Sequence, residues 1–289
     1  DGQISASFET NTIYYADDKG LPGSTPDDHF GSNNYLKVDY TYKKLSAGIQ
    51  LESYFPALYG YELGQQENPK RFWLGSKYIS WQDENFSVLA GNVYDQFGNG
   101  LIFRSYEDRQ LGLNNSLEGI SAGYDFSRFV SIKGMYGRPR LYTDYAGSWV
   151  RGLDLNISIA DIFNWDAVML YLEGSYVNRY ESLDKDATYD FYSLGLDTPQ
   201  LDMFSGSFNF AWKGLSVKGE YARKSKDLST ASSMKAAKGA AIFAEAVYTY
   251  KSLSVSGTFR MLDDMGTMLS LYGNGTGNSL NYLPSLTRQ

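Results

Sequence analysis

Residues 40–47 read YTYKKLSA, and nearly the same sequence returns at residues 248–255 as YTYKSLSV. A looser copy, FAWKGLSV, occupies residues 210–217. In a hairpin with a two-residue turn, the residues that flank the turn pair directly and point to the same face. With Lys-Lys as the turn of the first copy, Tyr42 pairs with Leu45, and the polar residues beside them fall on the opposite face. Because a slip of one residue would invert every assignment, three copies in the same register predict three β-hairpins.

Two further tight turns are predicted on weaker patterns. Residues 124–131, YDFSRFVS, place a turn at residues 127–128, but Ser131 then joins the apolar face. A longer turn over residues 82–85 also has an aromatic residue on either side. We expect both segments to connect antiparallel strands.

Long stretches of alternating character extend from these turns. Leu153, Leu155 and Ile157, for example, alternate with Asp154 and Asn156, so one face is apolar and the other polar. Such alternation suits either a soluble antiparallel sheet with one buried face or a transmembrane barrel whose apolar face meets lipid.

The lengths of the connections separate these two folds. The tight turns alternate with long polar connections, as in outer-membrane barrels, which have short periplasmic turns and longer extracellular loops. Aromatic residues beside each tight turn then fit the belt at a membrane interface. The long connections cover roughly residues 16–34, 56–70, 94–116, 137–148, 181–202 and 225–238, and the chain from 263 onward.

We therefore predict an all-β, antiparallel, up-and-down transmembrane β-barrel. Residues 188–197 resemble a strand, but a spanning strand there would put the next tight turn on the wrong side, so we place them in an outer loop. About thirteen spanning strands remain, an odd number, whereas bacterial barrels of one chain have an even number. We expect residues 1–289 to form a single barrel domain that is incomplete at its C-terminus and part of a larger even-numbered barrel. The predicted strands are 2–15, 33–43, 45–55, 71–82, 86–94, 117–126, 129–137, 147–160, 167–180, 203–212, 215–225, 239–250 and 253–262.

The composition agrees with a barrel and argues against several other classes. The 25 Tyr, 16 Phe and 5 Trp, with 29 Gly and 7 Pro, favour strands and turns over helices. The net charge of −7 and the lack of a basic cluster argue against a nucleic-acid partner. No apolar run is long enough for a transmembrane helix, and the absence of cysteine excludes thiolate chemistry. The start at Asp1 suggests a mature chain after signal-peptide removal, and we predict the bacterial outer membrane as its location.

Two stretches resemble a known family: DDHFGSNNYLKVDY at residues 27–40 and YDQFGNGLIFRSYEDRQLGLNNSLEG at residues 94–119. The family contains porin-like outer-membrane proteins of Bacteroidota and is catalogued only as a domain of unknown function. The resemblance covers most of the chain and runs to the final LPSLTRQ, after which such proteins continue. It implies an outer-membrane barrel, with no established activity, substrate or catalytic residue to carry over.

Polar residues on the strands and in residues 94–116 are candidates for the lining of a lumen. If residues 94–116 fold inward, Arg104 and Arg109 are expected to pair with the nearby acids and narrow a pore, whereas a solvated outer loop is the competing interpretation. The apolar Leu101–Phe103 favours inward packing. The lumen or constriction candidates are Asp95, Arg104, Glu107, Asp108, Arg109, Glu52, Asp154, Glu173, Glu220 and Arg260; the periplasmic-rim aromatics are Tyr40, Tyr42, Trp81, Phe126, Trp212, Tyr248 and Tyr250.

No catalytic, metal or cofactor site is predicted. The single histidine, His29, follows two aspartates, but no nucleophile motif accompanies it, so a solvated loop histidine is expected. The acidic pairs at 17–18, 83–84 and 263–264 lack the spacing of a calcium loop. The Gly-rich residues 273–282 lack the lysine of a phosphate-binding loop and are expected to form a flexible loop.

Three functions remain as alternatives. The first is a non-enzymatic, passive outer-membrane pore for small polar solutes, with the lipid bilayer as its partner. The second is a structural or accessory barrel with a filled lumen, in a complex with other outer-membrane or periplasmic proteins. The third is a soluble β-sandwich that binds glycans, which predicts that Ile157, Leu170 and Leu172 are buried between two sheets.

Overall fold

The computed structural model describes residues 2–18, 20, 27–59, 71–183, 191–228, 235–273 and 277–283. Its long strands form one antiparallel sheet in which each strand pairs with the next long strand along the chain. The long strands are β1 (Gln3–Tyr14), β2 (Phe30–Tyr42), β3 (Leu45–Tyr54), β4 (Phe72–Gln82), β5 (Phe86–Val93), β8 (Leu117–Ser127), β9 (Val130–Leu141), β11 (Trp149–Ser158), β12 (Val168–Tyr180), β13 (Gln200–Trp212), β14 (Leu215–Leu228), β15 (Ala236–Tyr250) and β16 (Leu253–Asp263).

The remaining elements are short. β6 (Glu107–Asp108) pairs with β7 (Leu113–Asn114) as a small separate hairpin, and β10 (Asp144–Tyr145) folds back on β9. One helical turn, α1 (Ile159–Ile162), lies in the connection between β11 and β12. In the described part of the chain, no helix is long and apolar enough to cross a membrane.

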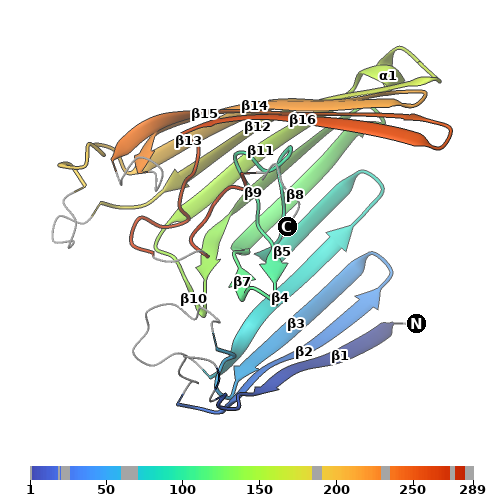
Figure 1. Cartoon of the computed structure of the whole chain (residues 1–289). Helices are drawn as coiled ribbons and strands as arrows, with labels where there is room; N and C mark the ends of the chain where they lie inside the picture. The colour runs from blue at the N-terminus through green and yellow to red at the C-terminus, as the bar shows by residue number, and fades with distance from the viewer. Residues whose placement is uncertain are drawn as a thin grey trace.

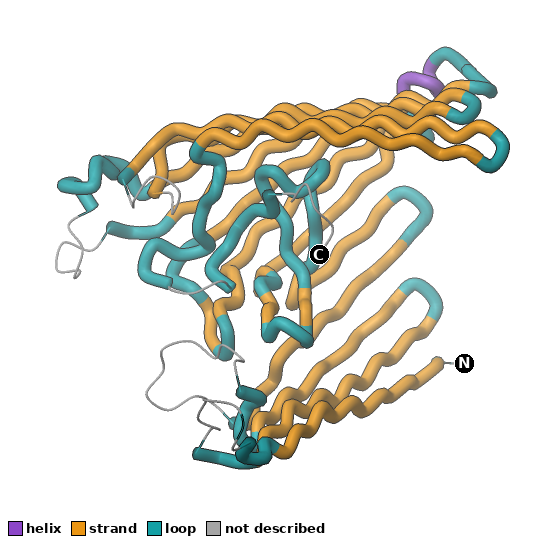
Figure 2. Tube along the Cα trace, in the orientation of Figure 1, coloured by secondary structure: helices purple, strands orange, loops and turns teal. Residues whose placement is uncertain are grey.

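The sheet curves around the segments that follow β5 and β16, as Figure 1 shows. Within the described ranges, β1 pairs only with β2 and β16 pairs only with β15, so the sheet is open between these two edges (Figure 2). The predicted all-β, up-and-down antiparallel fold and the positions of its strands are confirmed. The described part of residues 188–197, from 191 onward, lies outside the strands, as predicted. That the sheet closes into a barrel, and that residues 1–289 form part of a larger even-numbered barrel, stay predictions.

The repeated aromatic motif forms the predicted tight turns. Tyr42 pairs with Leu45 across the first turn, and the copies at 210–217 and 248–255 have the same register. Lys43, at the first turn position, has a φ of 52°, in the left-handed region, which lets so short a turn reverse the chain. We call the end of the sheet where these tight turns lie the tight-turn end. The opposite end, where the long connections lie, is the loop end.

The turn between β8 and β9 differs from its prediction. Ser127, instead of Phe126, flanks the turn and pairs with Val130, because a bulge adds Phe126 as an extra residue on β8. The bulge places Ser131 opposite Asp125 on the polar inner face, so it removes the serine from the apolar face. The predicted turn at residues 127–128 is therefore wrong by one residue.

The two faces of the sheet have the predicted alternation. On β11, Leu153 and Leu155 are 47% and 38% exposed on the outer face, whereas Asp154 between them is 3% exposed on the inner face. Leu172 is also exposed, and Ile157 and Leu170 are only half-buried. No second sheet covers the apolar face in the described part of the chain, so the soluble β-sandwich alternative is wrong.

Apolar packing on the inner face is concentrated toward the loop end. There, inward-pointing residues of β9 to β15 contact two segments, which we call the first inward segment (residues 94–116) and the second inward segment (residues 264–273 and 277–283). The second segment was predicted to be a polar outer connection, and this prediction is wrong. Buried members of the cluster include Phe97, Leu101, Ile102 and Phe103 of the first segment, Met265, Leu269 and Leu280 of the second, and Met135, Val150, Val177 and Met203 of the sheet.

Candidate functional site

The first inward segment leaves the sheet after β5 and returns at β8. Its apolar residues Phe97 and Leu101–Phe103 are fully buried against the inner face, which explains why the chain turns inward instead of into solvent. Between them, Gly98 and Gly100 have φ values of 54° and 90° and form a tight tip.

The tip is held by two carboxylates of the sheet. The Gly98 N–H donates to Glu173 Oε1 at 2.5 Å, and the Asn99 N–H donates to Glu220 Oε2 at 2.5 Å. Gly98 lies in the left-handed region, and a Cβ atom there would lie 2.7 Å from Glu220 Oε2, so both the backbone and the carboxylate favour glycine. Glu173 and Glu220 thus bind the segment instead of lining an open lumen.

Asp154 lies on the same inner face, and each of its two carboxylate oxygens accepts a hydrogen bond. Its carboxylate accepts from the Ser175 hydroxyl at 2.7 Å and from the Asn156 amide at 2.5 Å. Among the residues that the structure describes, neither Asp154 nor the carboxylates of Glu173 and Glu220 form an ion pair with a basic side chain. These carboxylates are therefore held by hydrogen bonds and not by ion pairs. No group of three or more acidic or histidine side chains within the described ranges has the arrangement of a metal site.

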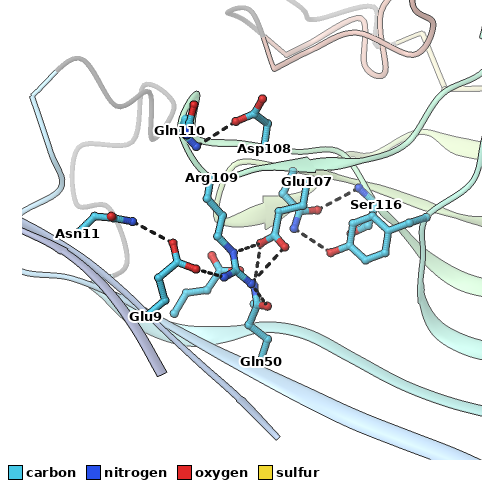
Figure 3. Close-up of polar contacts among 12 residues, drawn as sticks. Glu9, Asn11, Gln50, Glu107, Asp108, Arg109, Gln110 and Ser116 are labelled. Atoms are coloured by element: carbon cyan, nitrogen blue, oxygen red, sulfur yellow. Dashed lines mark hydrogen bonds and ion pairs between the residues drawn. The ribbon is translucent and has the colours of Figure 1, made fainter. Parts of the chain in front are cut away.

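Arg109 connects the first inward segment to strands β1 and β3 near one edge of the sheet (Figure 3). Its guanidinium donates to Glu9 Oε2 on β1 at 2.6 Å and to Gln50 Oε1 on β3 at 2.8 Å, and it lies 3.4 Å from Glu107 Oε1. The guanidinium also lies over the Tyr35 ring, 4.6 Å from its centroid. The segment therefore spans the concave side from β5 to β1.

The other charged residues of this segment have separate roles. Asp95 pairs with Lys133 of β9 at 2.7 Å, and the Asp108 carboxylate accepts backbone N–H groups of its own turn. Arg104 lies between two tyrosine rings, 4.6 Å from the Tyr106 centroid and 4.4 Å from the Tyr282 centroid. No described acid pairs with Arg104, so the predicted pairing holds for Arg109 and is wrong for Arg104.

A buried ion pair fixes the inner face near β3 and β9. Arg140 donates to both carboxylate oxygens of Glu52, at 2.9 and 2.7 Å, and both residues are almost fully buried. Trp73 and Tyr54 donate to the same carboxylate, at 3.2 and 2.9 Å. Glu52 is thus a neutralised structural residue and not part of a free lumen. Arg140 was not predicted as a site residue, because its partner lies 88 residues away in the chain.

The second inward segment is anchored by another buried pair. Arg179 of β12 lies 2.7 Å from Asp227 of β14, and both also bond to the segment, Arg179 to the carbonyl of Met268 and Asp227 to the hydroxyl of Thr267. Asn281 connects the second inward segment to the first inward segment. Its side-chain amide donates to the carbonyl of Leu101 at 2.8 Å and to the carbonyl of Met265 at 2.9 Å.

Glu181, just beyond β12, is a further anchor. Its carboxylate accepts from the Ser270 hydroxyl at 2.7 Å and from the Leu271 N–H at 2.5 Å. Burial raises the pKa of the Glu181 carboxyl, and these two hydrogen bonds lower it only in part. The described part of the Gly-rich residues 273–282 is therefore a packed segment; residues 274–276 lie outside the described ranges.

The predicted rim aromatics all lie near the tight-turn end, with exposed fractions from 39% to 64%. Aromatic residues at the loop end form a second exposed group, which was not predicted from the sequence. Its members are Tyr14, Phe30, Phe72, Trp149 and Tyr180. Arg260, the remaining candidate, lies opposite the inward-pointing Phe243 in the register of β15 and β16.

His29 and the acidic pair at residues 83–84 lie away from these contacts. His29 is exposed, and its Nδ1 lies 2.9 Å from the carbonyl of Tyr15. Asp83 pairs with Lys44 beside the first tight turn, and this hydrogen bond holds the pKa of Asp83 below its usual range.

Comparison with known proteins agrees with this fold. The family described as "Family of unknown function (DUF6029)" matches residues 1–289. The chain is similar to OccK9 (OpdG) of Pseudomonas aeruginosa, with 12% identity, a TM-score of 0.52, and coverage of 92% of this chain and 69% of that chain. It is also similar to OmpF of Salmonella typhi, in a complex with daunomycin, with 11% identity, a TM-score of 0.45, and coverage of 97% and 82%. No curated protein matches the chain.

The predicted resemblance to a family of unknown function is confirmed by the match over the whole chain. At such low identity the structural likeness shows the fold alone, which is that of outer-membrane porins. Together with the apolar outer face, this fold confirms the predicted outer-membrane location.

Proposed function

We propose that this chain, which belongs to the family of unknown function DUF6029, is a non-enzymatic, passive outer-membrane pore for small polar solutes. The observation that carries the proposal is the path of the first inward segment, which crosses the concave side of the sheet and is tethered at its far end by Arg109. In a barrel, a segment placed in this way narrows the lumen without sealing it.

The polarity of the inner face supports the same function. Toward the tight-turn end, the inner face has a cavity of about 380 Å³ whose polar lining includes Asn85, Ser131 and Asn156. A second cavity of about 470 Å³ lies beside the first inward segment, between Asp95 and Glu107. Polar side chains line both cavities, which suits hydrated solutes, and the charged ones among them are of both signs.

A second function is a structural or accessory barrel with a filled lumen, bound to other outer-membrane or periplasmic proteins. The apolar cluster of Phe97, Phe103 and Leu280 favours it, because such packing is typical of a permanent interior. The pore is favoured over it because the β6–β7 hairpin at the margin of the first inward segment lies outside the apolar cluster. An interior packed throughout would include this hairpin.

Replacement of the tether tests the pore directly. Arg109→Gln removes the ion pairs to Glu9 and Glu107, which are each expected to contribute under about 1 kcal/mol because they are partly exposed. Uptake of small neutral sugars into liposomes that contain the protein should rise by up to about fivefold, the ratio that about 1 kcal/mol allows.

The matched control is Lys251→Gln, since Lys251 lies in the tight turn between β15 and β16, with its Nζ 5.3 Å from the Tyr250 ring centroid. This variant should leave uptake unchanged. Equal uptake by Arg109→Gln and the unaltered protein, with both folded, would contradict the proposed constriction.

A further inference from the structure

The outer face of the sheet carries an unusual group of arginines near its loop end. Arg138 lies on β9, Arg151 on β11 and Arg223 on β14, and we call these three residues the arginine surface. The outer face is otherwise apolar toward the middle of the same strands, where Leu153 and Leu155 are exposed.

Strand register establishes that the first two arginines point outward. Val150 and Met135 are buried in the inner apolar cluster, so the neighbouring positions on β11 and β9 point to the outer face. Arg151 pairs with Tyr136 across these strands, and Tyr136 is 47% exposed. Arg138, two residues further along β9, therefore shares the outer face with Tyr136.

Two stacked aromatic rings lie between Arg138 and Arg151. The rings of Tyr136 and Trp149 have centroids 5.0 Å apart and planes 11° from parallel, and the Arg138 guanidinium lies 5.8 Å from the Trp149 centroid. Tyrosine and tryptophan with one exposed face are typical of the membrane interface. The arginines thus lie at the level where lipid headgroups begin.

In the described part of the chain, no arginine of this surface forms an ion pair with an acid. Arg138 donates only to the carbonyl of Ala146, at 3.2 and 3.1 Å, and Arg151 Nε donates to the Asn178 amide oxygen at 2.9 Å. Asp202, one strand beyond Asn178 in the register, accepts from Asn178 and Tyr176 at 2.8 and 2.6 Å. The carboxylate opposite Arg138 in the register, Glu118, pairs instead with Lys77 at 2.5 Å.

Arg223 extends this surface toward β14. Its guanidinium lies 5.8 Å from the Tyr221 centroid, and both side chains are exposed. In the register it lies opposite Phe204, whose ring contacts Tyr176 with centroids 4.9 Å apart. The combination of arginine and aromatic ring is therefore repeated across several strands of the same outer face.

We propose that the arginine surface binds the phosphate groups of lipid headgroups in the leaflet at the loop end. A guanidinium close to lipid requires a counter-charge, and its fork of N–H donors matches the oxygens of a phosphate. A phosphate over the stacked rings of Tyr136 and Trp149 receives the charges of Arg138 and Arg151 from either side, while the acyl chains lie against the apolar outer face toward the middle of the strands. This binding goes beyond pore function and does not require an open lumen.

Native mass spectrometry of the full chain, purified in detergent and mixed with lipid A, tests this surface. Each arginine near an anionic headgroup contributes roughly a fivefold change in binding, so the triple variant Arg138→Gln, Arg151→Gln, Arg223→Gln should retain roughly a hundredfold less lipid A. The single variant Arg223→Gln, at an exposed position, should lose about fivefold and serves if the triple variant does not fold.

The matched control removes three lysines at the tight-turn end: Lys43→Gln, Lys213→Gln, Lys251→Gln. Each of these lysines also lies over an aromatic ring, at 5.2, 4.7 and 5.3 Å from its centroid, so the control changes the same charge at the opposite interface. It should retain lipid A as the unaltered protein does.

Three outcomes would overturn the proposal. The first is unchanged lipid A binding in both arginine variants. The second is an equal loss in the lysine control, which would indicate nonspecific attraction. The third is displacement of lipid A by inorganic phosphate at equal concentration, which would indicate a free-anion site instead of a lipid site. A protein that conducts no ions but shows the predicted loss would contradict the pore alone.

Discussion

Arg179→Met is expected to lower the free energy of unfolding by about 3–5 kcal/mol, because it leaves Asp227 as a buried charge without a counter-ion. Both side chains are almost fully buried, at 2% and 1% exposure, and lie 2.7 Å apart. The same arginine bonds to the carbonyl of Met268, so its loss also releases the second inward segment from the sheet. Urea unfolding in detergent, followed by tryptophan fluorescence, measures the change.

Two further variants separate the buried charge from the loss of a side chain. The double variant Arg179→Met, Asp227→Leu should recover much of the loss, since removal of both charges abolishes the desolvation penalty. Arg128→Met, at an exposed arginine, should change the free energy of unfolding by less than about 0.5 kcal/mol. A loss for Arg179→Met as small as that of this control would show that the pair does not anchor the segment.

Leu155→Arg should cost about 2–4 kcal/mol, since it places a charge on the lipid-facing side of the sheet. Leu155 is exposed on the outer face of β11, opposite Gly174 near the middle of β12. Leu170→Arg, on the outer face of the neighbouring strand, should have a similar effect. The measurement is the fraction of protein that folds in lipid vesicles, followed by the shift in gel mobility on heating.

Asn156→Arg is the matched control, because Asn156 is the next residue along β11 and lines a cavity on the polar inner face. It should fold as the unaltered protein does. If both leucine variants fold normally in vesicles, the outer face does not contact lipid, and the orientation of the sheet proposed from its exposed apolar residues is wrong.

Strand positions and faces were predictable because they depend on neighbours in the sequence. The alternation around Asp154 and the repeated turns report local pairing, and a one-residue slip would have been visible as a polar residue on the apolar face. The weak copy near Ser131 carried such a conflict, and the structure resolves it with the bulge at Phe126. A conflict of this kind is a sequence signal for a bulge.

The contacts of the interior were not predictable in the same way. Glu52 and Arg140 lie 88 residues apart in the chain, and no periodic pattern relates them. The second inward segment reads as a loop because its apolar residues are separated by Asn, Ser and Gly. Its Asn281 side chain bonds to the backbone carbonyls of Leu101 and Met265, a role that only the folded chain defines. Inward packing at Leu101–Phe103 was the partial exception, since three adjacent apolar residues in a polar stretch favour burial, although a solvated outer loop remained the alternative.

The candidate lumen residues divide into two groups with different consequences for a pore. Glu173 and Glu220 hold the tip of the first inward segment, and Glu52 is neutralised, so changes at these positions act on stability first. Arg109 and Glu107 lie at the margin of the segment, outside the apolar cluster. Changes at these two positions are expected to alter the passage of solutes. The β6–β7 hairpin that carries them is small and lies outside the apolar cluster.

Single-channel conductance of the full chain in a planar bilayer is the most direct test of a constricted pore. We expect reproducible open steps, and a higher conductance when residues 107–112 are replaced by a short Gly-Ser linker that leaves Phe97–Phe103 in place. A silent bilayer for both proteins, with folding and insertion confirmed, would contradict the pore and indicate a filled barrel that acts with partner proteins.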